Sequence, residues 1–189
     1  GAGAAVAWED AGGGGGSLAL IGTAVASCSA TLTVAGLDTT YDTYLITIAD
    51  LHPEDDGVGL VLQLGDSGGI DSGASDYGFH TSTVCGGASC GYAVNRDNTA
   101  AHILLTDYVG YAAGEGAAGA VWLHRGSSGG LMYPTVSGNM ASIGAGAAVR
   151  GAVVYGNRHS AIDVTQVRVK FSGCAIETGR LSVWGLAHA

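Results

Sequence analysis

The sequence predicts an all-β, jelly-roll-like β-sandwich of about eight or nine antiparallel strands. Three observations support this prediction. Apolar residues alternate with other residues over short runs, which is the period of a strand with one buried face. The 34 glycines follow no collagen triplet and fall mostly between those runs, as in turn-rich β domains. No stretch shows a clear helical period of 3.6 residues.

The first 17 residues differ in composition from the rest of the chain. Residues 1–17 are rich in Gly and Ala, end in the glycine run Gly12 to Gly16, and contain one large apolar side chain, Trp8. We expect a flexible N-terminal arm (1–17) before a β-sandwich domain (18–189). Trp8 is a candidate for docking onto a neighbouring subunit or virion protein, and a terminus without a partner is the alternative.

The expected strands follow the alternation along the chain. Tyr44, Ile46 and Ile48 share one face, the turn Asp55-Asp56-Gly57 follows, and alternation resumes at Val58. We expect seven residues to be largely buried: Tyr44, Ile46, Ile48, Leu60, Leu62, Val167 and Val169. The nine expected strands are 23–36, 42–51, 58–64, 101–107, 117–124, 131–138, 147–155, 163–171 and 180–187. Most of 65–100 is expected to be loop, because it is rich in Gly and Ser.

The charge distribution argues against nucleic acid as a partner. The net charge is −9, and eleven of the sixteen acidic residues precede the first basic residue, Arg96. Residues 1–95 therefore carry −11, and residues 96–189 carry +2, from seven basic and five acidic groups. Nucleic acids and anionic membranes bind basic surfaces, so we expect neither as a partner.

Neither a membrane span nor a signal peptide is expected. Residues 18–37 contain no charge, but Ser27, Ser29, Thr31 and Thr33 alternate with less polar residues as in a strand. The N-terminus lacks the basic region of a signal peptide. We therefore expect a soluble chain without membrane insertion.

Four cysteines are present. Cys85 and Cys90 bracket the sequence GGAS, where either a disulfide or two reduced thiols would be possible. Their spacing does not match a zinc site. Cys28 and Cys174 are expected to pack as small apolar residues.

The candidate catalytic and metal motifs are weak. The string GDSGG at 65–69 is spelled like a serine-protease nucleophile loop with Ser67 as nucleophile, but His52 and Asp50 stand in no protease-like context. We expect Ser67 to be a turn residue, and the protein not to be an enzyme. The aspartates at 66, 71 and 76 could bind calcium or cap turns, and their spacing fits no known calcium loop. The six histidines form no ligand pair, so no metal or cofactor is expected.

Aromatic residues are a further candidate for binding. Exposed rings stack on sugars, although core packing is the alternative for each of them. The rings expected in or beside loops, and therefore the candidate glycan contacts, are Tyr77, Phe79, Tyr92, Tyr108 and Tyr111.

Two blocks of the chain resemble a known module. The first block contains Gly36-Leu37-Asp38, Tyr41-Asp42, Tyr44, Pro53, Asp56-Gly57, Asp71-Ser72-Gly73 and Asp76-Tyr77. The second is the closing string VTQVRVKFSGCAIETGRLSVWGLA, with Gly179, Leu181 and Gly185-Leu186. Together they cover nearly half the chain and resemble a module of bacteriophage tail-fibre-like and other virion-surface proteins.

The resemblance implies a function on a virus particle. It implies a virion-surface structural protein, made in the host cytoplasm and adhesive towards the host surface, as a tail-fibre-like knob, a head or tail spike, or a capsid decoration. It also implies a homotrimer that contacts other virion proteins and, at the host surface, glycan. A stand-alone carbohydrate-binding module is the alternative from another class, and a polysaccharide-degrading enzyme is the least favoured.

Overall fold

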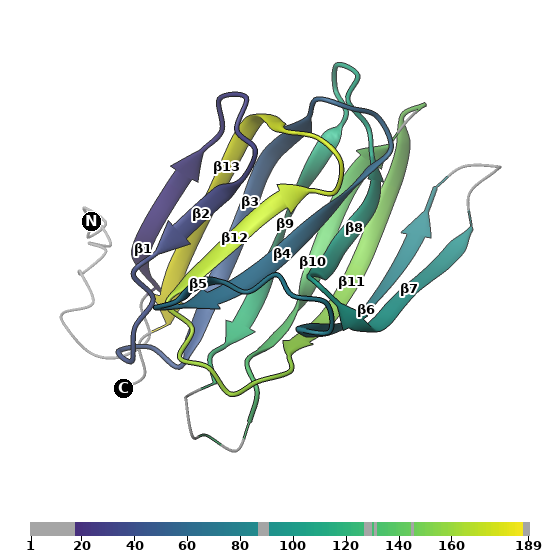
Figure 1. Ribbon diagram of the computed structural model, residues 1–189. Coiled ribbons are helices and arrows are strands. Elements are labelled where there is room, and N and C mark those ends of the chain that lie inside the picture. The colour runs from purple at the N-terminus through teal and green to yellow at the C-terminus, as the bar shows by residue number, and fades with distance from the viewer. Residues whose placement is uncertain (1–17, 87–90, 127–129, 131, 145, 187–189) are drawn as a thin grey trace, which may run out of the picture.

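The computed structural model describes residues 18–86, 91–126, 130, 132–144 and 146–186. These residues form thirteen strands and no helix, which confirms the all-β prediction (Figure 1). The strands are β1 (Leu18–Val25), β2 (Leu32–Ala35), β3 (Thr43–Pro53), β4 (Val58–Asp66), β5 (Gly69–Ile70), β6 (Tyr77–Cys85), β7 (Tyr92–Ala100), β8 (Ile103–Val109), β9 (Gly116–His124), β10 (Thr135–Gly144), β11 (Ala148–Arg158), β12 (Gln166–Phe171) and β13 (Ile176–Leu186).

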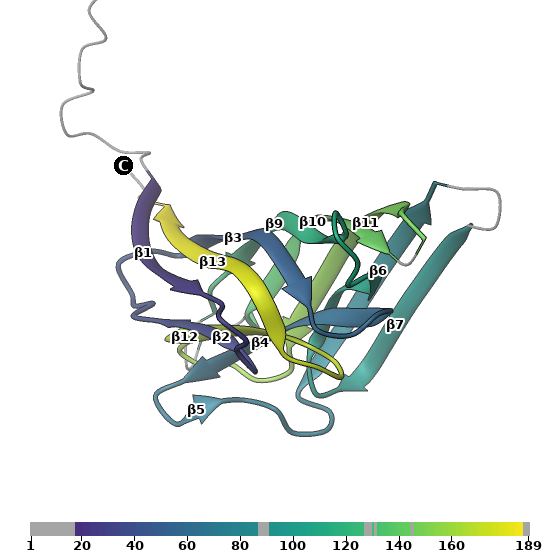
Figure 2. The same cartoon turned by 90° about the horizontal axis from the view of Figure 1, so that it is seen from above.

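The strands form two antiparallel sheets. The larger sheet has the order β1-β13-β3-β9-β10-β11-β6-β7, and the smaller one has the order β2-β12-β4-β5, with β8 also paired to β4. Seen from above, the two sheets form separate layers (Figure 2). The sandwich prediction is thus confirmed. The jelly-roll topology is not, because the strands divide into eight and five instead of two similar four-stranded sheets.

The core lies between the two sheets and follows the predicted alternation. Tyr44, Ile46 and Ile48 of β3 are buried, as are Leu60 and Leu62 of β4. Val167 and Val169 of β12 are fully buried as well. All seven residues expected in the core are therefore there, because the period of two places every second side chain between the sheets.

Three predictions about the strands are wrong. The described residues form thirteen strands, where eight or nine were expected. The segment 65–100 contains the hairpin β6–β7, which was expected to be loop. Strand β7 is exposed along most of its length, so its sequence shows no alternation. The expected strand 23–36 is two strands, β1 and β2, and the chain turns between them where Cys28 adopts a φ of 48°. Cys28 is exposed, contrary to expectation, whereas Cys174 packs against the core.

The residues that carry the resemblance hold the corners of the fold. The Tyr44 hydroxyl donates to the Asp38 carbonyl and accepts from the Asp38 amide, both at 2.8 Å. Gly57 completes the β3–β4 turn with a φ of 70°. Gly185 lies under the Tyr41 ring, where a Cβ would overlap the ring. These contacts are structural, so the motif residues that make them are evidence about the fold and not about a binding site.

The arm at 1–17 with Trp8 lies outside the described residues, and so does Cys90. Cys85 is disulfide-bonded, which excludes the alternative of a reduced thiol at this position, and its pairing with Cys90 stays a hypothesis. No helix in the described part of the chain is long and apolar enough to cross a membrane.

Candidate ligand-binding face

The outer face of the larger sheet is formed by those side chains of each strand that point away from the core. In β9, Val121 and Leu123 point into the core and Trp122 points outward, 37% exposed. The same alternation places Trp184 of β13 and Tyr155 of β11 on this face. In Figure 1 the face lies on the far side, because the smaller sheet covers the near side.

The register of the sheet aligns these residues into one row across all eight strands. We call it the central row, and each member is the direct register partner of the next: Leu20, Trp184, Leu45, Trp122, Ser137, Tyr155, His80 and Arg96. Its three aromatic residues stand on alternate strands, with Leu45 and Ser137 between them. Neighbouring strands are about 5 Å apart, so successive rings lie about 10 Å apart across the sheet.

Two further rows, which contain both polar and apolar side chains, flank the central row. One flanking row consists of Val94, Ser82, Val153, Asn139, Ala120, Thr47, Ser182 and Thr23. The other consists of Gly78, Asn157, Thr135, His124, Thr43, Leu186 and Leu18. The Trp184 indole N–H donates to the Thr47 hydroxyl at 3.4 Å, which orients the ring. The face is thus a surface of rings bordered by hydroxyl, amide and imidazole groups together with apolar side chains.

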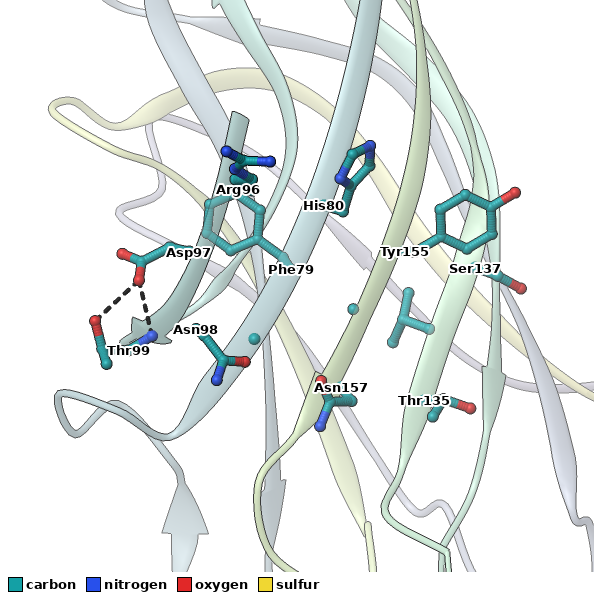
Figure 3. A pocket seen from close by; sticks show the side chains of 13 residues that line it. Phe79, His80, Arg96, Asp97, Asn98, Thr99, Thr135, Ser137, Tyr155 and Asn157 are labelled. Atoms are coloured by element: carbon teal, nitrogen blue, oxygen red, sulfur yellow. Dashed lines mark hydrogen bonds between the residues drawn. The ribbon is translucent and has the colours of Figure 1, made fainter. Parts of the chain in front are cut away.

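Two hollows lie at opposite ends of this face. The larger, of about 1030 Å³, lies between β7 and β10 beside His80, Arg96 and Tyr155 (Figure 3). The smaller, of about 340 Å³, lies beside Trp184 and Arg180. Both ends of the central row therefore combine an aromatic ring with an arginine.

The five aromatic residues proposed from the sequence do not form one surface. Tyr77 is fully buried, so its ring cannot stack on a glycan, and the prediction is wrong for this residue. Burial raises the pKa of its hydroxyl, which donates to the Leu64 carbonyl. Phe79 is half-buried, packs against the core and stacks on His102, with ring centroids 6.5 Å apart.

The other three predicted rings are exposed but separated. Tyr92 is 67% exposed and lies on the outer face, where its hydroxyl is 3.1 Å from the Ser82 hydroxyl. Tyr108 is the second-last residue of β8 in the smaller sheet, and the Arg150 guanidinium lies 4.9 Å from its ring centroid. Tyr111 lies in the loop that follows β8. Of these three, only Tyr92 therefore belongs to the outer face, and of the other two candidates Phe79 also lines the larger hollow.

The candidate nucleophile lies in a turn. Ser67 stands between β4 and β5, and the next amide, that of Gly68, donates to the Asp66 carboxylate at 2.7 Å. The His52 ring bonds the Glu177 carboxylate at 2.8 Å and the Ala112 carbonyl at 3.3 Å. The position of Ser67 is thus that of a turn residue capped by Asp66.

An arginine pairs with two carboxylates of the acidic loop. The Arg158 guanidinium lies 2.9 Å from the Asp71 carboxylate and 3.2 Å from that of Asp76. Within the described residues, no group of three or more His, Cys, Asp or Glu side chains has the arrangement of a metal site. Arg158 therefore supplies a positive charge between the carboxylates of Asp71 and Asp76.

Trp122, Trp184 and Tyr155 were not among the sequence candidates. The sequence did contain evidence that these side chains point away from the core, because each alternates with the core residues of its own strand, as Tyr155 does with Val154. What the sequence lacked was the register that aligns three distant strands. Comparison with known proteins adds no assignment to this face: no family model, no curated protein and no solved structure matches the chain.

Proposed function

We propose that this protein is a non-catalytic adhesive module on the surface of a bacteriophage particle, and that it binds host-surface glycan through the outer face of its larger sheet. The observation that supports glycan binding is the central row. Aromatic side chains offer flat apolar faces for sugar rings, and bordering hydroxyls and amides can bond the sugar hydroxyls. The resemblance of the two sequence blocks to virion-surface modules supports the location.

The spacing of the rings favours an extended glycan over a compact ligand. Trp184, Trp122 and Tyr155 repeat at about 10 Å across the sheet, which is close to the length of two sugar units in an extended β-linked chain. An extended chain lying along the central row would meet one ring with every second sugar. A single small molecule would contact only one of them.

The proposal also covers the assembly. We propose a homotrimer that contacts other virion proteins, with the arm at 1–17 and Trp8 as its attachment. Light scattering of the full chain at micromolar concentration tests the trimer, and a monodisperse monomer contradicts it. Co-purification with particles tests the virion location; a chain that never sediments with particles yet binds glycan would instead be a stand-alone carbohydrate-binding module.

The binding experiment compares variants on and off the central row. Wild-type protein, the double variant Trp122→Ala/Trp184→Ala and the control Tyr111→Ala are tested against immobilised and soluble polysaccharides. Tyr111 is an exposed aromatic residue, 54% accessible, that lies outside the outer face, so its loss should not affect binding there. We expect binding by the wild type and the control, and at least a tenfold loss in the double variant, since each stacked ring contributes about 1 kcal/mol.

Two outcomes would contradict the proposed binding face. The first is equal glycan binding by the double variant and the wild type. The second is a change in oligomeric state in the double variant without any glycan binding by the wild type, which would make the face a subunit interface. Release of sugars from a bound polysaccharide by the wild type would contradict the non-catalytic part of the proposal.

A further inference from the structure

The larger hollow on the outer face has a buried glycine at its floor. Gly78 of β6 lies between Asn98 of β7 and Asn157 of β11. A Cβ at position 78 would lie 2.7 Å from the Asn98 side-chain oxygen and 3.1 Å from that of Asn157. Two side-chain amides therefore converge over a position that any other residue would fill.

The amides at the floor have no protein partners. Among the described residues, neither the Asn98 nor the Asn157 side chain makes a hydrogen bond, although both line the hollow. His159 also approaches Gly78, and its Nδ1 lies 3.2 Å from the Ser75 carbonyl. Amide groups that are free to donate and to accept are suited to the hydroxyls of a sugar.

The wall of the hollow carries an unpaired cation. Arg125, Arg150 and Arg158 each form an ion pair with a carboxylate. Arg96 forms no ion pair with any described residue, although the chain carries a net charge of −9. The neighbouring carboxylate of Asp97 accepts from the Thr99 amide at 2.8 Å and from its hydroxyl at 2.9 Å, so it is already occupied (Figure 3).

Tyr155 and His80 also line the hollow. Tyr155 is 57% exposed, and His80 stands between it and Arg96 in the central row. The His80 Nε2 lies 2.8 Å from the Ser82 hydroxyl, which in turn lies 3.1 Å from the Tyr92 hydroxyl, so the imidazole is held in place. Arg96 and Tyr155 are two strands, or about 10 Å, apart, which leaves room for one sugar ring and its substituent.

We infer that this hollow binds a uronate, a sugar with a carboxylate group, at one end of the glycan that occupies the central row. The sugar ring packs against Tyr155, its hydroxyls bond Asn98 and Asn157, and its carboxylate pairs with Arg96. The planar guanidinium can donate two parallel hydrogen bonds to a carboxylate. This inference rests on the proposed function and adds the chemical class of the terminal sugar.

The test uses ligands that differ in the charge of their carboxyl groups. A β-linked oligoglucuronate and its fully methyl-esterified form are titrated into the full-length wild type, and into Arg96→Gln and Lys170→Gln. Lys170 is the control, because its replacement removes one positive charge from β12 of the smaller sheet, away from the outer face. We expect the wild type to prefer the acid over the ester about tenfold, and this preference to weaken as NaCl is added.

The variants locate the preference. Arg96→Gln should remove it by weakening acid binding alone, and Lys170→Gln should leave it intact. A preference that survives in Arg96→Gln, or is lost in Lys170→Gln, overturns the assignment, and so does an Arg96-dependent preference for sulfated or phosphorylated sugars over carboxylated ones.

The two proposals fail in different ways. If the wild type binds neutral glycans through Trp122 and Trp184 but does not distinguish acid from ester, only the uronate assignment is wrong. If neither charged nor neutral glycans bind, the adhesive function is wrong as well.

Discussion

Tyr77 and Leu64 connect the two sheets through a buried hydroxyl. Tyr77 begins β6 in the larger sheet, and its hydroxyl accepts from the Leu64 amide of β4, in the smaller sheet, at 2.8 Å. The same hydroxyl is 2.9 Å from the Leu64 carbonyl, to which it donates. Both residues are fully buried. The hydroxyl thus satisfies backbone groups of β4 beyond Leu62, where the pairing of β4 with β8 ends.

Removing this hydroxyl should destabilise the fold without changing its shape. Tyr77→Phe leaves the Leu64 amide buried without its partner, which costs about 1–3 kcal/mol in the free energy of unfolding. Urea denaturation measures the loss. Tyr111→Phe, at an exposed position, should change stability by less than about 0.5 kcal/mol. Equal stability of Tyr77→Phe and the wild type would contradict the role of the hydroxyl.

Arg158 should be required for the stability of the loop between β5 and β6. Its guanidinium bonds Asp71 and Asp76, and its side chain is only 11% exposed. Arg158→Gln leaves two carboxylates without their partner, and we expect a loss of about 2 kcal/mol. Thermal unfolding of the wild type should be the same in CaCl2 and in EDTA, because Arg158 supplies the positive charge. Stabilisation of the wild type by calcium would contradict this.

His102 should make the fold sensitive to mild acid. Burial, and secondarily the charge of Lys170, lowers the pKa of His102 in the folded protein, so protons bind the unfolded chain more readily. The stability that His102 contributes is therefore complete above its unfolded pKa of about 6.5 and is lost as the pH falls through its lower folded pKa. Urea denaturation at pH 7.5 and 5.5 should show a larger loss for the wild type than for His102→Gln. Identical losses would contradict the prediction.

Gly179 should tolerate no side chain. Its φ is 115°, and a Cβ there would overlap the backbone of Asp50, which itself has a φ of 53°. Gly179→Ala should cost about 2 kcal/mol through backbone strain. Gly151→Ala is the control, because a Cβ at 151 meets no atom within 4 Å and the residue lies on the outer face. Similar unfolding midpoints for the two variants would contradict this reading.

Much of the fold was predictable because alternation is a local signal. The period of two in β3, β4 and β12 is enough to identify the buried faces, including those of Ile46, Leu62 and Val169. The hairpin β6–β7 was missed because its outer strand packs on one edge only and has no apolar face. Exposed edge strands are stabilised by backbone pairing, which leaves little trace in side-chain type.

The sequence by itself determined the fold class, the faces of the strands and the turn at Gly57, because these depend on neighbouring residues. It also placed Trp184 opposite the core residues of its strand. Only the tertiary structure decided that Trp184, Trp122 and Tyr155 share a row, and that Arg96 ends it beside Gly78. Such a row depends on the register of eight strands whose partners lie far apart in the chain, and a shift of one residue in any strand would turn its ring into the core.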